Sequence, residues 1–315
     1  MSTQYFGKNG WTPERIKNLH GKTYLITGTN TGAGFEAARM LLSKGAEVVM
    51  LNRSEEKTLK AIDSLKESIG SHIKVSFIKL DLSSLSSVRR AAEEVIHKIP
   101  HIDALICNAA VAQIATRTLT ADGFEMQLGV NYYAYFLLTQ LLFDKIEQSK
   151  GRIVYVSSEG YKMGLKRIKF EDMNFNEGYA PNTAYAQSKL ALMVFAYELQ
   201  RRIKKAQKQV KVYVCHPGAA KTSLIRPNAP WLTRATWWIL AHSPLVQSAE
   251  KGAYPEVMCA TEENLKQEAF YGPTGFMQWS GPVGECKVEP FVFDETAAAK
   301  LWAISEEATH CKWTF

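Results

Sequence analysis

Tyr185 and Lys189 form a YxxxK pair that could transfer protons. The pair opens the stretch Tyr185–Ala206, which has the pattern of a long helix. Residues four apart share one face of a helix, so the ammonium group of Lys189 can lie near the phenol of Tyr185. A nearby positive charge favours the phenolate and lowers the phenol pKa from its ordinary value of about 10. The spacing therefore predicts that Tyr185 is a proton donor and acceptor near neutral pH.

Two serines follow the short apolar stretch Ile153–Val156, which reads as a buried strand ahead of that helix. Ligands of a parallel sheet bind at the carboxyl ends of its strands. A hydroxyl group at this place can therefore hydrogen-bond a carbonyl or alcohol oxygen. Ser157 and Ser158 are both candidates, and Ser157 also has a simple interpretation as the end of the strand.

A glycine-rich turn, residues 27–34 with the sequence TGTNTGAG, follows the first apolar strand. Glycines let the backbone turn tightly and approach a pyrophosphate, and the next helix presents free N–H groups to the phosphates. Because the turn lies between a strand and a helix, the pattern predicts dinucleotide binding rather than a purely structural turn. The candidate contact residues of this glycine turn are Gly28, Asn30, Thr31, Gly32 and Gly34.

The end of the second strand indicates which dinucleotide is bound. An NAD-selective site needs a carboxylate there to bind the ribose hydroxyls, and this chain has Asn52 and Arg53 instead. Asn52 does not repel a 2′-phosphate, and Arg53 can form a forked, charge-assisted pair with one. We therefore expect NADP(H) rather than NAD(H). The alternative is that Arg53 is a solvated residue at the start of a helix.

Apolar stretches and helical patterns alternate over the first two thirds of the chain. The expected strands are Thr23–Ile26, Glu47–Leu51, Val75–Leu80, Ala104–Ile106, Ile153–Val156 and Val212–Cys215. The expected helices are Phe35–Ser43, Glu55–Ser68, Ser86–His97, Phe124–Ile146 and Tyr185–Ala206. Apolar strands separated by helices predict a parallel sheet that is covered on both faces. The expected fold class is α/β, a doubly wound parallel sheet or Rossmann fold.

The last third of the chain has a weaker pattern. Helical character returns at Ala249–Ala260, Phe270–Tyr271 reads as a final edge strand, and Gly272–Pro290 reads as loop. Asp294–Ser305 reads as a closing helix with Asp294 as its N-cap. Since no internal repeat or low-complexity linker is present, we expect one domain over residues 21–315, preceded by an N-terminal arm at 1–20.

The composition is that of an ordinary globular protein, with 46% hydrophobic and 22% charged residues. This excludes a disordered chain and a coiled coil. The formal net charge of +7 leaves nucleic acid, an acidic membrane and a phosphate-bearing ligand open as partners. Because the basic residues are dispersed and no recognition module is present, we expect no nucleic-acid partner.

The five cysteines form no CxxC pair and show no zinc spacing with histidine. We therefore expect no metal site and interpret most of the thiols as small apolar side chains. The polar stretch 1–11 holds no apolar run of a signal peptide. No stretch reaches the roughly 18 apolar residues of a spanning helix. These features predict a reducing, cytoplasmic compartment.

Several motifs occur in an order that resembles the short-chain dehydrogenase/reductase family. Among them are the TGxxxGxG glycine turn, the YxxxK pair and the LW-x-x-S ending at 301–305. The closest resemblance is to retinol dehydrogenase-like and WW-domain-oxidoreductase-like members, without a WW domain ahead of the turn. The family's serine is the second of a pair, which selects Ser158 over Ser157.

The resemblance also implies roles for residues after the third and fourth strands. Asp81 and Leu82 match a pair that contacts the adenine, and Asp81 is also a plausible helix N-cap. Asn108 and Ala109 match the first two residues of an Asn-Ala-Gly turn that borders the cofactor. Ala110 replaces the final glycine of that turn in this chain.

Further roles are implied nearer the reacting atoms. Asn131 matches an asparagine that holds a water in a proton relay with Lys189, which would also bind the nicotinamide ribose. Pro217 and Gly218 begin a PGxxxT segment that ends at Thr222. In the family this threonine binds the nicotinamide carboxamide, so Thr222 is expected to do the same.

The implied reaction is hydride transfer between a nicotinamide and a carbonyl or alcohol carbon of a small-molecule substrate. Ser158 would orient and polarise the oxygen, and Tyr185 would give or take the proton. One alternative is a non-catalytic NADP(H)-binding sensor or scaffold protein, which could have lost Ser158, Tyr185 and Lys189. Another is a light-dependent protochlorophyllide reductase-like enzyme, a relative with a similar tyrosine and lysine.

A Trp-rich segment, about 223–248, lies where the family places its substrate lid. Its aromatic content predicts a lipophilic or aromatic substrate. Two other interpretations are a helix packed in the core and a weak membrane-surface contact through 231–240, beside basic residues. Many family members form dimers or tetramers through two long helices, here Phe124–Ile146 and Tyr185–Ala206, so a homo-oligomer is also among the expected partners.

Overall fold

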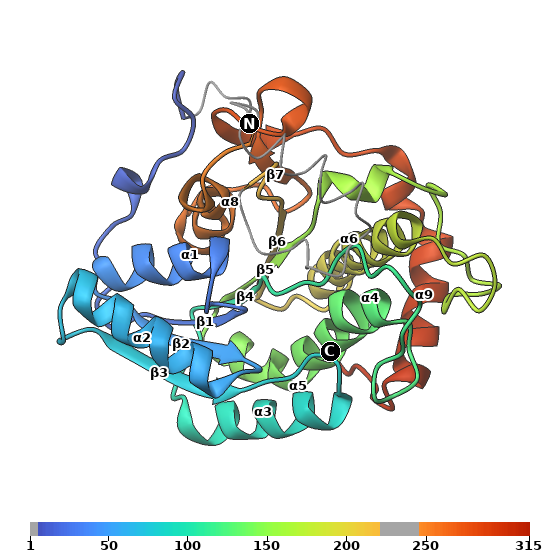
Figure 1. Ribbon diagram of the computed structural model, residues 1–315, viewed down its shortest axis with the longest axis horizontal. Coiled ribbons are helices and arrows are strands. Elements are labelled where there is room, and N and C mark those ends of the chain that lie inside the picture. Colours follow the sequence, from blue (N-terminus) through green and yellow to red (C-terminus); the bar gives the residue numbers. More distant parts are fainter. Residues whose placement is uncertain (1–5, 221–245) are drawn as a thin grey trace.

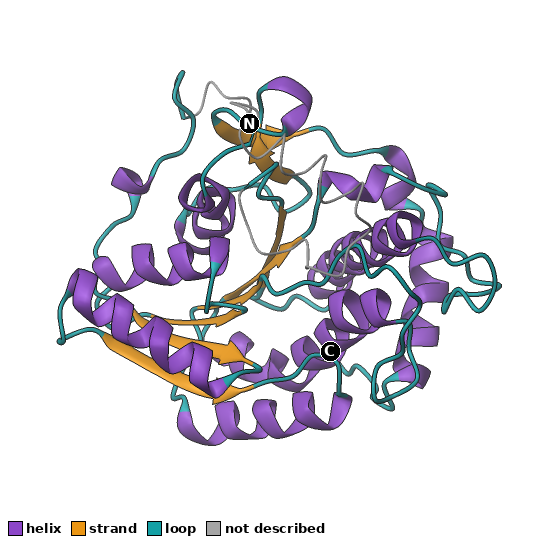
Figure 2. Ribbon diagram, viewed as in Figure 1, coloured by secondary structure: helices purple, strands orange, loops and turns teal. Residues whose placement is uncertain are grey.

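Eight strands form one sheet in the part of the chain that the computed structural model describes, residues 6–220 and 246–315 (Figure 2). Their order across the sheet is β3-β2-β1-β4-β5-β6-β7-β8. The bounds are β1 Thr23–Thr27, β2 Glu47–Asn52, β3 Lys74–Lys79, β4 Ala104–Cys107, β5 Arg152–Val156, β6 Lys211–Cys215, β7 Phe270–Pro273 and β8 Val283–Cys286. Neighbouring strands are parallel except for the β7–β8 pair, which is antiparallel.

Helices cover both faces of this sheet (Figure 1). The bounds of the α-helices are α1 Gly32–Ser43, α2 Glu55–Ile69, α3 Leu85–Lys98, α4 Met126–Leu128, α5 Ala134–Gln148, α6 Pro181–Lys205, α8 Ala249–Thr261 and α9 Glu295–Ala308. Short helical turns are η2 Pro13–Arg15, η3 Gly129–Tyr133, η4 Glu159–Lys162, η5 Phe276–Gln278 and η6 Pro290–Phe293. The doubly wound α/β fold predicted from the sequence is confirmed.

Alternation along the strands explains why the sheet carries helices on both sides. Tyr24 and Ile26 of β1 belong to the hydrophobic cluster under α1, α2 and α8. Leu25, between them, belongs to the cluster under α3, α5, α6 and α9. Successive side chains of a strand point to opposite faces, so each apolar strand supplies both cores at once.

Two elements differ from the expectation. The stretch Gly272–Pro290, predicted as loop, contains strand β8, and β8 rather than Phe270–Tyr271 is the edge of the sheet. The strand consists of four residues, Val-Gly-Glu-Cys, which is too short and too polar for a recognisable pattern. The predicted helix Phe124–Ile146 is divided into α4, the π-helical turn η3 and α5.

The first residues of the described chain pack onto the domain. Trp11 is 1% exposed, and Ile16 and Leu19 are also buried in the cluster under α1 and α8. The indole N–H of Trp11 donates to a carboxylate oxygen of Glu262 (3.1 Å), just after α8. Much of the expected N-terminal arm therefore contributes to the core of the domain.

Other expectations concern the cysteines, the closing helix and special sites. Four of the five cysteines are buried free thiols, as their interpretation as small apolar residues predicts. The carboxylate of Asp294 accepts from the N–H of Ala297 and caps α9, which confirms the predicted N-cap. Among the described residues, no helix is long and apolar enough to cross a membrane. Nor does any group of three His, Cys, Asp or Glu side chains there suit a metal ion.

Candidate active site

Two cavities lie at the carboxyl ends of the parallel strands and hold nearly all of the predicted site residues. The inner cavity, about 370 Å³, is lined by the glycine turn, Asn108, Ala109, Ser158, Tyr185, Lys189, Pro217 and Gly218. The outer cavity, about 760 Å³, is lined by Asn52, Arg53, Asp81 and Leu82 and by part of the glycine turn. Of the predicted residues that the structure describes, only Asn131 lines neither cavity. Thr222 and residues 223–245 of the expected lid lie outside the described residues.

The glycine turn has the conformation that its sequence requires. Gly28 and Gly32 have φ angles of +73° and +67°, a region that side chains rarely adopt. A Cβ atom on Gly34 would lie 2.4 Å from Nδ2 of Asn108 and 2.5 Å from the carbonyl oxygen of Gly28. No acidic residue lies in the first turn of α1. The positive end of this helix therefore faces the inner cavity without a carboxylate that would compete with a phosphate.

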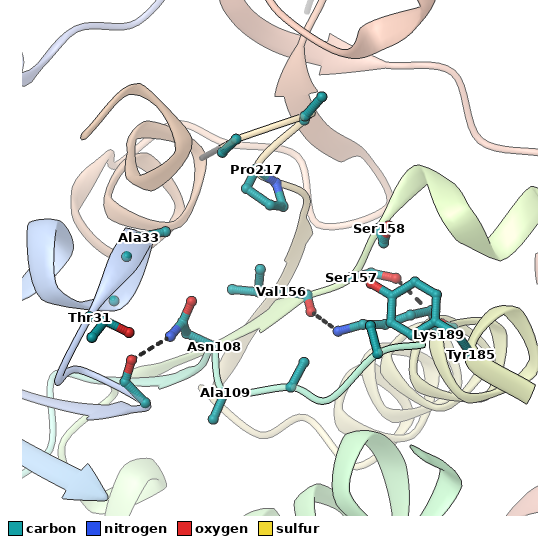
Figure 3. A pocket seen from close by; sticks show the side chains of 18 of the residues that line it. Thr31, Ala33, Asn108, Ala109, Val156, Ser157, Ser158, Tyr185, Lys189 and Pro217 are labelled. Atoms are coloured by element: carbon teal, nitrogen blue, oxygen red, sulfur yellow. Dashed lines mark hydrogen bonds between the residues drawn. The ribbon is translucent and has the colours of Figure 1, made fainter. Parts of the chain in front are cut away.

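Asn108 connects the turn after β4 to the glycine turn (Figure 3). Its Nδ2 donates to the carbonyl oxygens of Thr27 (2.8 Å) and Gly28 (3.2 Å). The hydroxyl oxygen of Thr27 accepts from the backbone N–H groups of Asn108 and Ala109, both at 3.0 Å. Asn108 therefore fixes the shape of the cradle. Thr27, which sequence reasoning did not select, has the same role.

We expect Gly34→Val to weaken NADPH binding at least tenfold, because the new side chain must displace Asn108 or the backbone of Gly28. Titration of NADPH fluorescence measures the affinity. Gly178→Ala is the control, since Gly178 lines neither cavity and has open space around it, and its φ of +63° makes a side chain there cost stability alone. The control should lose some thermal stability and keep its NADPH affinity. Unchanged affinity in Gly34→Val would contradict a phosphate-binding role of the turn.

The two residues predicted to contact the cofactor at the end of β2 have different roles in the structure. Asn52 is buried, and its amide accepts from the N–H of Thr29 and donates to the hydroxyl of Thr29, both at 2.8 Å. Its side chain therefore braces the glycine turn. Arg53 is exposed and lines the outer cavity. Lys57, in the first turn of α2, lines the same cavity and is a second cation that sequence reasoning missed.

The predicted adenine pair also lines the outer cavity, with one correction. Asp81 does not cap the following helix, because the N-cap of α3 is Ser84. The carboxylate of Asp81 instead accepts from the backbone N–H of Ser83 (2.9 Å) and from its hydroxyl (2.6 Å). Leu82 is 8% exposed and presents an apolar surface to the cavity.

Ser158, Tyr185 and Lys189 meet in the inner cavity (Figure 3). Helix α6 begins with Pro181 at its first position, which suits a helix start. This start places Tyr185 and Lys189 on one face, with Nζ of Lys189 6.0 Å from the centroid of the Tyr185 ring. Nζ donates to the carbonyl oxygen of Val156 at the end of β5 (2.8 Å). The YxxxK pair and the serine after β5 are therefore brought together as the sequence predicts.

Gly160 makes this contact between Ser158 and Tyr185 possible and was not selected from the sequence. A Cβ atom there would lie 2.9 Å from Cε1 of Tyr185 and 3.2 Å from the hydroxyl of Ser158. The backbone N–H of Gly160 also donates to that hydroxyl (3.0 Å). The only sequence signal is the Ser-Glu-Gly order directly after the strand.

The pKa values of the pair differ from the expectation. Burial raises the pKa of Tyr185 to about 12, and the hydroxyl of Ser158 acts in the opposite direction. Burial lowers the pKa of Lys189 to about 8. The predicted net lowering of the Tyr185 pKa is therefore wrong for this structure, because the effect of burial dominates. Both groups are desolvated, and desolvation disfavours the charged form of each.

Asn131 lies in the π-helical turn η3 between α4 and α5 and is completely buried. Its Oδ1 accepts from the N–H of Val111, and its Nδ2 donates to the carbonyl oxygen of Val111 and the hydroxyl of Ser188. Both N–H donors of the side chain are therefore used. The side chain ties the loop after β4 to the face of α6 that carries the YxxxK pair, and its part in a water relay stays a prediction.

Pro217 and Gly218 complete the inner cavity after β6. Gly218 has a φ of +67°, and a Cβ atom there would lie 2.3 Å from the carbonyl oxygen of Trp279. Its N–H donates to Nδ1 of His216 (3.2 Å). Burial lowers the pKa of His216 to about 3, so its ring is a neutral acceptor at ordinary pH.

Known proteins resemble this chain over most of its length. Residues 22–170 match the family model described as short chain dehydrogenase. The chain is 38% identical to retinol dehydrogenase 14 of Mus musculus, over 91% of this chain and 86% of that protein. It is 35% identical to retinol dehydrogenase 12 of Homo sapiens, over 94% and 88%. The chain belongs to the short-chain dehydrogenase/reductase family, and it is an oxidoreductase related to the retinol dehydrogenases.

Solved structures show the same fold. An uncharacterized protein from Mycobacterium paratuberculosis superposes with a TM-score of 0.78 at 32% identity, over 97% of this chain and all of that one. A short chain dehydrogenase from Shigella flexneri, complexed with NADP, superposes with a TM-score of 0.60 at 22% identity, over 79% and 94%. At that identity the second likeness concerns the fold alone.

Proposed function

We propose that the protein is an NADP(H)-dependent oxidoreductase that interconverts a carbonyl compound and the corresponding alcohol. The observation that carries this proposal is the inner cavity, in which Ser158, Tyr185 and Lys189 share one space with the glycine turn. A proton-transfer group and a phosphate cradle in one cavity suit hydride transfer accompanied by proton transfer.

The residues present fit a nicotinamide dinucleotide. The cradle is kept open by Gly34, where a Cβ atom would meet Asn108 and Gly28. The outer cavity continues from it and carries Arg53 and Lys57, two cations suited to a phosphate. The bound cofactor would supply or accept the hydride. The glycine turn, Lys189 and Pro217–Gly218 are the residues that would hold it.

The protein's own side chains perform the proton chemistry. The hydroxyl of Ser158 can donate a hydrogen bond to the substrate oxygen, which fixes and polarises it. With a pKa of about 12, the phenol of Tyr185 is protonated at neutral pH and so is a proton donor to an oxygen that gains charge during reduction. The cation of Lys189, when protonated, stabilises the phenolate that this transfer leaves.

Arg53→Ala is expected to lower kcat/KM for NADPH about 10- to 100-fold and to leave kcat/KM for NADH nearly unchanged. The reason is the loss of a charge-assisted hydrogen bond to the 2′-phosphate, which only NADPH carries. Initial rates with each cofactor measure the ratio. Lys60→Ala on α2, where the lysine pairs with Glu56, is the control and should keep the preference of the wild type. Equal losses with both cofactors would refute the assignment of Arg53.

A panel of carbonyl compounds and alcohols, followed by NADPH absorbance in the dark and in parallel with NADH, tests the proposed function. Turnover in the dark contradicts the light-dependent protochlorophyllide reductase-like alternative. NADPH binding without turnover on any substrate would favour the sensor or scaffold alternative. Faster turnover with NADH would overturn the proposed cofactor preference.

We further propose that the substrate is lipophilic or aromatic. Two observations support this: the Trp-rich composition of residues 223–248 and the similarity to proteins named retinol dehydrogenases. The panel should therefore include retinal, retinol and aromatic aldehydes beside small polar ketones. Faster turnover of the polar ketones than of the lipophilic and aromatic compounds would contradict this part of the proposal. Turnover of the polar ketones and of no other compound would contradict it as well.

We propose a cytoplasmic enzyme, which cell fractionation tests.

A homo-oligomer through α5 and α6 must accommodate an aromatic cluster that already covers these helices. Trp302 of α9 lies 5.5 Å from the rings of both Phe136 and Phe195, and Trp313 lies 5.3 Å from Phe143. Light scattering during size-exclusion chromatography measures the oligomeric state.

A further inference from the structure

Gln113 lies at the junction of the inner and outer cavities. The two cavities share six lining residues: Gly28, Asn30, Thr31, Ala109, Ala110 and Gln113. Most of these are small, or belong to the glycine turn already described. Gln113 is the longest of the six side chains, and none of the sequence motifs includes it. It is partly buried, and its amide makes no hydrogen bond to any residue that the structure describes.

The backbone of Gln113 is strained. Its φ of +57° lies in the left-handed region, which glutamine rarely adopts. Several other residues besides glycine share such an angle, but among the described residues only Gln113 does so while lining either cavity of the site. A glycine would adopt this backbone with less strain. Strained residues at the edge of a ligand site suggest a function for the side chain.

Hydrogen bonds to residues before and after Gln113 in the chain fix the position of its loop. Two residues earlier, both backbone polar groups of Val111 are bound by the amide of Asn131, at 2.8 Å each. Asn131 is in turn bound to Ser188, which precedes Lys189 on α6. One residue later, Ile114 accepts a hydrogen bond from the hydroxyl of Tyr179 (2.7 Å). The loop that carries Gln113 is therefore held against the helix that carries the YxxxK pair.

We propose that Gln113 is a further cofactor-binding residue, whose amide hydrogen-bonds the part of a dinucleotide that passes from the outer to the inner cavity. The inference rests on the proposed function, because it requires that a dinucleotide occupies both cavities. An uncharged amide with two donors and one acceptor suits the phosphate oxygens and ribose hydroxyls of that part. Because the amide has no partner among the described residues, it can bind these groups without first breaking a bond to them.

The test compares the binding of NADPH and of 2′,5′-ADP by calorimetry in the full-length protein. We expect Gln113→Ala and Gln113→Gly to weaken NADPH about five- to tenfold, as the loss of one hydrogen bond implies. Binding of 2′,5′-ADP, which lacks the nicotinamide ribose and the second phosphate of the bridge, should change less than twofold. Equal weakening of both ligands would overturn the assignment of Gln113 to the junction.

The glycine variant separates the amide from the backbone strain. If strain alone mattered, Gln113→Gly would bind NADPH at least as well as the wild type, and the proposal would be wrong. Gln207→Gly is the matched control, because Gln207 has the same φ of +57° and lines neither cavity of the site. It should keep full affinity. Thermal unfolding of each variant shows whether the fold is retained.

Different results would overturn the proposed function and the role of Gln113. A wild-type protein that binds neither NADPH nor NADH would remove the proposed function and this inference together. A wild-type protein that binds NADPH, with Gln113→Ala binding it equally well, would remove only the role of Gln113.

Discussion

Tyr185→Phe is expected to lower turnover about 10²- to 10⁴-fold, the usual contribution of a general acid or base, and to leave NADPH affinity unchanged. In the proposed mechanism the phenol is the proton donor, and it lines the inner cavity beside Ser158. Phenylalanine keeps the ring, and therefore its packing near Gly160 and Lys189, but cannot donate a proton. Steady-state rates on the best substrate of the panel, together with NADPH titration, measure both quantities.

The control for this prediction is Tyr254→Phe. Tyr254 is a partly buried tyrosine on α8 that packs against Trp11 and lines neither cavity. Removing its hydroxyl should change neither rate nor affinity. If Tyr185→Phe kept more than a tenth of the wild-type turnover, the proton would have to come from another group, and the proposed mechanism would fail. A loss of NADPH affinity as large as the loss of rate would instead indicate a role in binding.

The second large effect concerns Glu256, a buried carboxylate on α8. Its side chain is 1% exposed, and neither carboxylate oxygen has a hydrogen-bond partner in the described part of the chain. Burial raises its pKa from 4.5 to about 8. Close to it in the fold are Cys215 of β6 and Tyr135 of α5, neither of which offers a compensating positive charge.

The raised pKa makes stability depend on pH in a defined direction. The folded state binds a proton at Glu256 more tightly than the unfolded state does. The stability from this group is therefore fully present below pH 4.5 and is lost progressively as the pH rises to about 8. Each pKa unit corresponds to about 1.4 kcal/mol, and relaxation of a buried site reduces the sum, so we expect a total loss of about 2–4 kcal/mol.

Glu256→Gln should remove this loss, because glutamine has nearly the same shape and carries no charge. Urea unfolding at several pH values measures the effect. Near pH 4.5 the free energies of unfolding of the wild type and of Glu256→Gln should differ only by the cost of burying an amide in place of a protonated carboxyl group. At pH 9 the variant should be more stable than the wild type. The matched control is Glu93→Gln on α3, whose side chain is exposed. Parallel stability curves for wild type and Glu256→Gln would show that Glu256 gains a partner or water on ionisation.

The local sequence was sufficient to predict the fold and the grouping of the main candidate residues at one edge of the sheet. Apolar strands that alternate with amphipathic helices predict a parallel sheet, and a parallel sheet brings the carboxyl ends of its strands together. That geometry alone places the glycine turn, Ser158 and Pro217 at one edge. The i, i+4 spacing places Tyr185 and Lys189 on one face of α6. Rules about strand ends and helix spacing were therefore enough to predict that these residues lie close together.

The sequence could not reveal which polar side chains form hydrogen bonds to other residues of the protein instead of to a ligand. Asn52 and Asn131 both read as ligand contacts, but their amides are bound to Thr29 and to Val111 and Ser188. Asp81 likewise binds Ser83 rather than capping α3. Each partner depends on a distance across the fold or on the path of a loop. No spacing rule contains the distances across the fold on which the partners of Asn52 and Asn131 depend.

What the sequence by itself determined is the α/β fold, the position of the glycine turn and the close approach of Tyr185 and Lys189, the proposed proton-transfer pair, because these depend on hydrophobic periodicity and on residues a few positions apart. Only the tertiary structure decided the protonation of that pair, the burial of the Glu256 carboxylate without a hydrogen-bond partner among the described residues, and the place of Gln113 between the cavities. The physical reason is that desolvation, hydrogen-bond satisfaction and cavity shape depend on every element packed around a group, and those elements come from distant parts of the chain.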